Sequence, residues 1–133
     1  MKISGYHNTE DSNVTDIMSN GFKAKRSNKH WLGQGIYFFA DISTALNNID
    51  MLTHKDAIKT IGVEIVVSPA QYLDLDNPDN LNAFRRYYQS KISEFETSGV
   101  KFNIQKTDKK TASLIYRCLI MDLYKDEKNF AVI

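Results

Sequence analysis

The residues best suited to chemistry form two groups about thirty positions apart. These groups are Gly5-Tyr6-His7-Asn8-Thr9 and Trp31-Leu32-Gly33-Gln34-Gly35-Ile36-Tyr37-Phe38-Phe39, the second followed by Ser43 and Ala45. Either ring nitrogen of His7 can bond a hydroxyl group, and Tyr37 offers a ring that stacks on a flat cation. Taken alone, each has an ordinary structural explanation, as a hydrogen-bonded His at a strand end or as a Tyr in a core. The joint pattern is more specific than either residue.

Motifs of several common enzyme classes are absent from the sequence. Neither G-x-x-x-x-G-K-[ST] nor G-x-G-x-x-G occurs, which removes the usual phosphate-binding loops. No nucleophile elbow of the G-x-S-x-G type is present. The possible zinc ligands His7, His30, His54 and Cys118 lack the paired spacing that structural zinc sites need. The sequence therefore predicts no metal site.

The joint pattern resembles the ADP-ribosyltransferase superfamily, on the branch that includes diphtheria toxin and the poly(ADP-ribose) polymerases. In that family the first strand carries Tyr-His-Gly-Thr or His-Gly, and the second carries Gly-hydrophobic-Tyr-Phe. The resemblance covers residues 3–46. The motif from Trp31 to Phe39 is similar to that of bacterial members, several of which act as toxins or phage-defence effectors. It implies an α+β fold in which mixed strands form a split, small β-sheet core with flanking helices. It also implies that NAD⁺ is the substrate and that ADP-ribose passes to a macromolecule.

The resemblance also implies roles for individual residues. His7 would hold the adenosine ribose with Thr9 beside it, and Tyr37 would stack on the nicotinamide ring. Gly35 would let backbone and ligand approach closely, since it has no side chain. Asn8 stands where the family has a Gly whose backbone binds the nicotinamide amide. Asn tolerates unusual backbone angles better than most residues, so that contact can be kept.

The family's catalytic Glu lies on a later strand, where its carboxylate stabilises the developing oxocarbenium ion. After Tyr37 the chain offers Glu64 on an expected strand, Glu94 and Glu96 at the end of an expected helix, and Glu127. Order along the chain makes Glu127 the candidate, and an exposed Glu in the charged stretch 125–128 is the alternative. The chain also ends inside an expected strand. We therefore expect the strand with the catalytic Glu to lie beyond residue 133 or to be absent, which would make this chain a fragment or a catalytically deficient relative.

Hydrophobic spacing and turn residues predict the elements that position these residues. We expect strands over 1–7, 35–39, 59–68, 72–76 and 130–133. We expect one helix capped by Asn13 or Thr15 and ended by Gly21, and a second capped by Asp41 or Ser43 and running through Leu52. Two further helices are expected over 80–95 and 111–124. The result is an α+β chain with mixed strands, in one domain over residues 1–133.

Composition narrows the setting of the protein. The 133 residues carry a net charge of +1, which argues against a strong nonspecific hold on nucleic acid or on an anionic membrane. Two basic patches, 23–26 and 106–110, can meet a phosphate or can be solvated surface, and the Arg26 region is a candidate for the NAD⁺ pyrophosphate. No apolar run approaches the length that spans a bilayer. The single Cys118 favours a reducing compartment, so we expect a cytoplasmic protein.

Three functions remain open from the sequence. The first is an ADP-ribosyltransferase acting on a protein or nucleic-acid acceptor, with an antitoxin or inhibitor protein as a further partner. The second is a binding module of the same fold that lacks catalysis and recognises NAD⁺, ADP-ribose or a protein. The third is a structural or interaction protein whose motifs match by accident. Nicotinamide release separates the first from the second, and stabilisation by NAD⁺ separates the second from the third.

Overall fold

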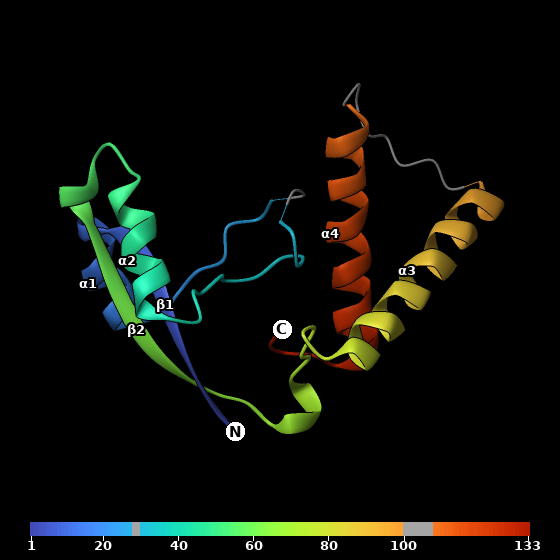
Figure 1. Cartoon of the computed structure of the whole chain (residues 1–133), viewed down its shortest axis with the longest axis horizontal. Helices are drawn as coiled ribbons and strands as arrows, with labels where there is room; N and C mark the ends of the chain where they lie inside the picture. Colours follow the sequence, from blue (N-terminus) through green and yellow to red (C-terminus); the bar gives the residue numbers. More distant parts are fainter. Residues whose placement is uncertain (28–29, 100–107) are drawn as a thin grey trace. The chain divides into compact units, whose positions relative to one another are not determined.

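The structure is a computed structural model that describes residues 1–27, 30–99 and 108–133. Contacts divide the chain into two compact units, coloured along the sequence in Figure 1. Unit 1 comprises Met1–Lys25 and Ile36–Val67, and unit 2 comprises Arg26–Gly35 and Ser68–Ile133. The described residues form a mixed α+β chain with one two-stranded sheet and four α-helices. The α+β class and the four helices are as the sequence predicts, whereas the sheet has fewer strands than expected. That the two units act as one domain stays a prediction.

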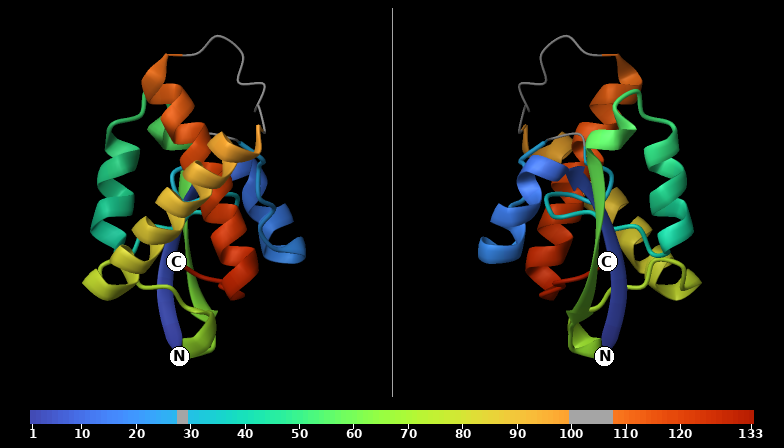
Figure 2. Two further views of the ribbon diagram at one scale, coloured as in Figure 1. Left: turned by 90° about the vertical axis from the view of Figure 1, so that its right-hand side faces the viewer. Right: turned by 90° about the vertical axis from the view of Figure 1, so that its left-hand side faces the viewer.

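Unit 1 is built on an antiparallel pair of strands. β1 (Lys2–Glu10) pairs with β2 (Ile58–Val66) along its whole length, and the short 3-10 helix η1 (Lys55–Ala57) leads into β2. α1 (Asp11–Asn20) and α2 (Ile42–Asp50) lie on opposite sides of this sheet (Figure 2). The strands predicted over 1–7 and 59–68 are therefore confirmed, and β1 ends three residues later than expected.

β1 also pairs on its other edge, at one position. Tyr6 donates to the Phe39 carbonyl at 2.9 Å, and the Phe39 N–H donates back at 2.7 Å. The buried strand predicted over Gly35–Phe39 is wrong, because only Phe39 joins the sheet. Ile36 and Tyr37 stay 37% and 39% exposed. The reason is that the His7 side chain bonds the Tyr37 carbonyl.

α1 begins directly where β1 ends. Its N-cap is Glu10, which makes no side-chain capping bond, so the caps predicted at Asn13 and Thr15 are wrong. The predicted end at Gly21 is confirmed: its φ is 79°, a left-handed value that suits glycine, and its N–H donates to the Ile17 carbonyl at 2.8 Å.

Unit 2 is a helical pair with a small core. α3 (Pro78–Ser98) and α4 (Lys109–Lys128) follow the short 3-10 helix η2 (Pro69–Gln71) and confirm the helices predicted over 80–95 and 111–124. Both start earlier than expected because Asn77 and Asp108 cap them through side-chain oxygens. The buried core consists of Leu73, Phe84, Ile120, Met121 and Tyr124.

The strands predicted over 72–76 and 130–133 are wrong. The two segments meet in a single parallel bridge between Tyr72 and Val132. The Leu73 N–H donates to the Val132 carbonyl at 2.8 Å, but the Asp74 carboxylate then accepts from the Asp76 N–H and turns the chain. This local side-chain bond competes with the ladder and ends it. The described residues therefore contain no split sheet core.

The Asp41 carboxylate forms the cap of α2. It accepts from the Ser43 hydroxyl at 2.6 Å, and from the Thr44 N–H and hydroxyl, each at 2.8 Å. These bonds, that from Ser43 foremost, lower the pKa of Asp41 to about 2. The cap predicted at Asp41 is thus confirmed.

Replacing the capping carboxylate should destabilise unit 1. We expect Asp41→Ala to lower the melting temperature at pH 7 by about 5 °C, whereas Asp41→Asn, which still caps, changes it little. Because the pKa is depressed, the stabilisation is present above the ordinary value of 3.8 and is lost as pH falls towards 2. Thermal unfolding followed by circular dichroism from pH 7 to 2 tests this. Equal melting temperatures for wild type and Asp41→Ala at pH 7 would contradict it.

Candidate functional site

Unit 1 brings His7 and Tyr37 into direct contact. The His7 Nδ1 lies 2.8 Å from the Tyr37 carbonyl oxygen. A carbonyl oxygen only accepts, so Nδ1 carries the hydrogen, and Nε2 of the neutral ring is then an acceptor. Nε2 makes no hydrogen bond to the described residues of the chain. The contact thus fixes the ring and leaves one nitrogen for a ligand hydroxyl.

Aromatic packing holds the His7 ring from the side. Its centroid lies 5.1 Å from that of Phe22 and 5.8 Å from that of Phe38, and both contacts are edge-to-face. Phe22 and Phe38 also contact each other edge-to-face at 5.2 Å. A Cβ on Gly5 would lie 3.0 Å from that of Phe38, so glycine makes room for this cluster. The sequence does not predict the contact of Phe22 with His7, since nothing local ties the two residues together.

The backbone of Asn8 is the most distinctive feature of this edge. Successive residues of a strand direct their N–H and C=O groups to alternate edges, so Asn8 shares the edge at which Tyr6 bonds Phe39. A regular ladder would pair Asn8 with Tyr37. Instead the His7 ring holds the Tyr37 carbonyl, and no described residue bonds the backbone N–H or C=O of Asn8. One donor and one acceptor therefore face the same way, beside the His7 ring.

The side chain of Asn8, by contrast, is fully used within unit 1. Its Nδ2 donates to the Ala45 carbonyl at 2.8 Å and to Asn48 Oδ1 at 3.4 Å, both on α2. Its Oδ1 accepts from the Thr60 hydroxyl of β2 at 2.8 Å. These bonds hold β1 against its neighbours and fix the backbone at this residue. Any ligand contact of Asn8 must then be made by its backbone.

Two other residues of the predicted site have different surroundings. The Thr9 hydroxyl accepts from Asn13 Nδ2 at 3.4 Å, at the start of α1. Gly35 belongs to unit 2, and a Cβ there would meet nothing within 4 Å. Position 33 is the one in this loop that requires glycine, because its φ is 82° and a Cβ there would overlap the Asp122 carboxylate. The close approach of a ligand at Gly35 stays a prediction, and the close contact that the structure shows is that of Gly33 with α4.

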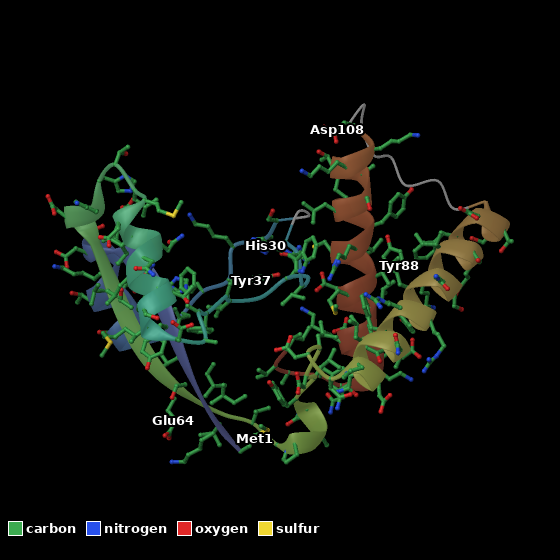
Figure 3. All side chains as sticks on the ribbon, in the orientation of Figure 1. Met1, His30, Tyr37, Glu64, Tyr88 and Asp108 are labelled. Atoms are coloured by element: carbon green, nitrogen blue, oxygen red, sulfur yellow. The ribbon has the colours of Figure 1, made fainter. Side chains whose placement is uncertain are left out.

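The carboxylate expected to act on the ligand has a defined partner. Glu127 lies in the last turn of α4, in unit 2, and accepts from the Tyr87 hydroxyl at 2.9 Å. Lys128 lies 3.8 Å from it. Glu64 on β2 forms an exposed ion pair with Lys2 at 2.8 Å, and Figure 3 labels it. The strand position expected for Glu64 is confirmed, and its side chain is exposed.

A second feature, within unit 2, is the loop that carries Gln34. The Gln34 N–H donates to Asp122 at 2.8 Å, and its carbonyl accepts from Lys125 at 2.6 Å, so α4 holds the loop from both sides. A cavity of about 440 Å³ lies there, lined by loop residues that include Arg26 and by one face of α4. Burial raises the pKa of the Cys118 thiol in the wall of this cavity. A raised pKa favours the protonated thiol over the nucleophilic thiolate.

Comparison of the chain with protein-family models, with curated proteins and with solved structures finds no match. Among residues 1–27, 30–99 and 108–133, no three His, Cys, Asp or Glu side chains form a group that would hold a metal ion. Across the same residues, no helix combines the length and the apolar character needed to cross a membrane. The geometry of unit 1 is therefore the basis for assigning a function.

The Tyr87–Glu127 pair gives a titration that reports on the Glu127 carboxylate. Burial and then the bond to Glu127 raise the pKa of Tyr87 to about 12. We expect Glu127→Gln to lower this pKa, because the negative charge is removed, and Lys128→Gln to leave it high. Since the pKa is raised, the folded state is stabilised below pH 10, and this stabilisation is lost as pH rises towards 12. Absorbance at 295 nm, as the difference from Tyr87→Phe, isolates the group. An unchanged titration in Glu127→Gln would show that the pair does not form.

Proposed function

We propose that unit 1 binds NAD⁺ in the manner of an ADP-ribosyltransferase and that the chain transfers ADP-ribose to a macromolecule. The observation that carries this proposal is the unpaired N–H and C=O of Asn8 beside the His7–Tyr37 contact. A primary carboxamide has one oxygen that accepts and one nitrogen that donates. The nicotinamide amide therefore complements Asn8, with its oxygen on the N–H and its nitrogen on the C=O.

The remaining contacts of NAD⁺ follow from the same geometry. His7 Nε2 is the acceptor for a ribose hydroxyl, because Nδ1 is committed to Tyr37. The Tyr37 side chain keeps 39% of its surface exposed and can stack on the cationic nicotinamide, which is worth about 0.5–2 kcal/mol. Hydroxyl, carboxamide and cationic ring all occur in NAD⁺. The observed groups thus suit the nicotinamide riboside half best.

The reaction breaks the bond between nicotinamide and ribose. The bonding electrons leave with nicotinamide, the ribose becomes an oxocarbenium ion, and a nucleophile of the acceptor attacks and loses its proton. A carboxylate near the developing cation lowers this barrier. Glu127 is the candidate, and its bond to Tyr87 in unit 2 favours a second candidate function, a catalytically deficient NAD⁺ or ADP-ribose binding module.

Ligands that differ only at the amide test the role of Asn8. We expect NAD⁺ to bind at least about tenfold more tightly than nicotinic acid adenine dinucleotide, because a carboxylate cannot donate to the Asn8 carbonyl. ADP-ribose, which lacks the ring, is the matched control and should also bind more weakly. Isothermal calorimetry measures all three. Equal affinity for NAD⁺ and ADP-ribose would show that the nicotinamide is not held.

Substitutions at Tyr37 separate stacking from folding. We expect Tyr37→Ala to weaken NAD⁺ binding by roughly 2-fold to 30-fold, the range of the stacking energy, whereas Tyr37→Phe keeps the ring and most of the affinity. Melting temperatures of both variants control for stability. Unchanged affinity in a folded Tyr37→Ala variant would remove Tyr37 from the site.

Release of nicotinamide distinguishes the two candidate functions. We expect this chain to release nicotinamide from NAD⁺ slowly, and Glu127→Gln to change the rate little, because a carboxylate misplaced by about 1 Å can cost a hundredfold. Chromatography of nicotinamide over time, against a blank without protein, measures this. Rapid release abolished by Glu127→Gln would make Glu127 the catalytic residue. NAD⁺ binding with no release would leave the binding module.

A further inference from the structure

Trp31 and Arg117 form an exposed aromatic and cationic pair on unit 2. The guanidinium carbon of Arg117 lies 3.7 Å from the centroid of the Trp31 ring, which is a close cation–π contact. Although the guanidinium covers part of the ring, Trp31 remains 58% exposed. Nε of Arg117 is buried and has no hydrogen-bond partner among the described residues. A large aromatic surface therefore stays open beside a cation.

Further cationic and aromatic groups lie next to this pair. Burial lowers the pKa of Arg117, nearby Tyr88 raises it, and nearby Arg85 adds to the lowering. Arg85 and Tyr88 are three residues apart on α3 and so share one face. Lys110 precedes Arg117 by two turns on the same face of α4, about 10 Å along the axis. Together, these residues make what we name the Trp31 surface: Trp31, Arg85, Tyr88, Lys110 and Arg117.

The charges of this surface are not neutralised inside the described structure. Across the described residues of both units, each carboxylate that forms an ion pair is bound to a lysine. These lysines are Lys2, Lys23, Lys91, Lys125 and Lys128. Within residues 1–27, 30–99 and 108–133, no arginine has an ion pair. Glu94, the carboxylate of α3 with such a bond, is held by Lys91. The arginines are thus available to an anion from outside the chain.

The small net charge of the whole chain conceals an uneven distribution. By sequence, unit 2 has 12 Lys and Arg against 9 Asp and Glu, a net of +3, and unit 1 has 5 against 7, a net of −2. The predicted basic patch 106–110 belongs to unit 2, although Lys106 and Thr107 lie outside the described residues. The near-zero net charge of the whole chain therefore does not exclude nucleic acid at unit 2.

We propose that the Trp31 surface binds single-stranded nucleic acid. Unpaired bases stack on exposed aromatic rings, and the guanidinium group suits phosphate through its planar donors. An acidic peptide would match the charge but has no flat ring for Trp31. A duplex would meet the cations but keeps its bases stacked on one another. Only an unpaired strand uses both features of the surface.

Trp31 is the single tryptophan of the chain, so its fluorescence reports on this surface alone. We expect a twelve-nucleotide oligouridylate or oligothymidylate to quench it and to bind more weakly as salt rises. A twelve-base-pair DNA duplex and polyglutamate are the comparison probes. The two oligonucleotides show whether RNA or DNA is preferred. The proposal would be overturned if the duplex or polyglutamate quenched the fluorescence and bound as strongly as the oligonucleotides do. It would also be overturned if neither oligonucleotide bound.

Variants locate the binding within the surface. In polarisation measurements with labelled oligonucleotide, we expect Trp31→Ala and Arg117→Gln each to weaken binding by about tenfold. Arg117→Gln should also lower the salt slope by about 1. If Arg117→Gln does not fold, Lys110→Gln, which removes an exposed charge of the same surface, takes its place in the measurement. Lys128→Gln removes the same charge next to Glu127 and should leave binding unchanged. Equal loss in Lys128→Gln would show a diffuse charge effect and overturn the proposal. No NAD⁺ is present, so the result is independent of the proposed function.

Discussion

The hydrogen bond from the His7 ring to the Tyr37 carbonyl determines the form of unit 1 at its candidate site. A strand edge normally continues to pair until a turn or a proline stops it. Here the side chain takes the carbonyl that the next backbone N–H would need, so pairing ends at Phe39 and the Asn8 groups stay open. Backbone groups left unpaired are tolerated where water or a ligand satisfies them. Two further contacts of the ring, with Phe22 and Phe38, pack it in this position.

Elements defined by local signals could be predicted from the sequence. Asp41 and Gly21 mark helix ends through bonds and backbone angles that involve only near neighbours, and α3 and α4 follow from apolar spacing over many residues. The residues around Tyr37 have the aromatic and β-branched content of a buried strand, and that content led to a wrong prediction. The deciding contact comes from His7, thirty residues away, and no local pattern contains it.

The candidate site could likewise be predicted from the sequence only in part. The family resemblance implies that His7 and Tyr37 serve one ligand, and the structure brings the His7 ring to the Tyr37 backbone. The open backbone of Asn8 could not be anticipated in detail, since it depends on which edge of β1 each residue faces, and so on the register with Phe39. The need for glycine at position 33 likewise depends on Asp122, far along the chain on α4. Resemblance names the residue types, whereas long-range packing decides which of their atoms remain available.

The distribution of arginine gives the two proposed activities an electrostatic logic. All four arginines of the chain belong to unit 2, whereas the cations of unit 1 are lysines, outnumbered by carboxylates. A net positive unit attracts a polyanion, and a net negative unit repels it. Guanidinium groups also bind phosphate with fixed geometry, which ammonium groups do not. With the arginines confined to unit 2, the proposed nucleic-acid strand would bind that unit and compete little for the edge at Asn8. The same separation would let a chain of nearly zero net charge bind a polyanion at unit 2, as we propose.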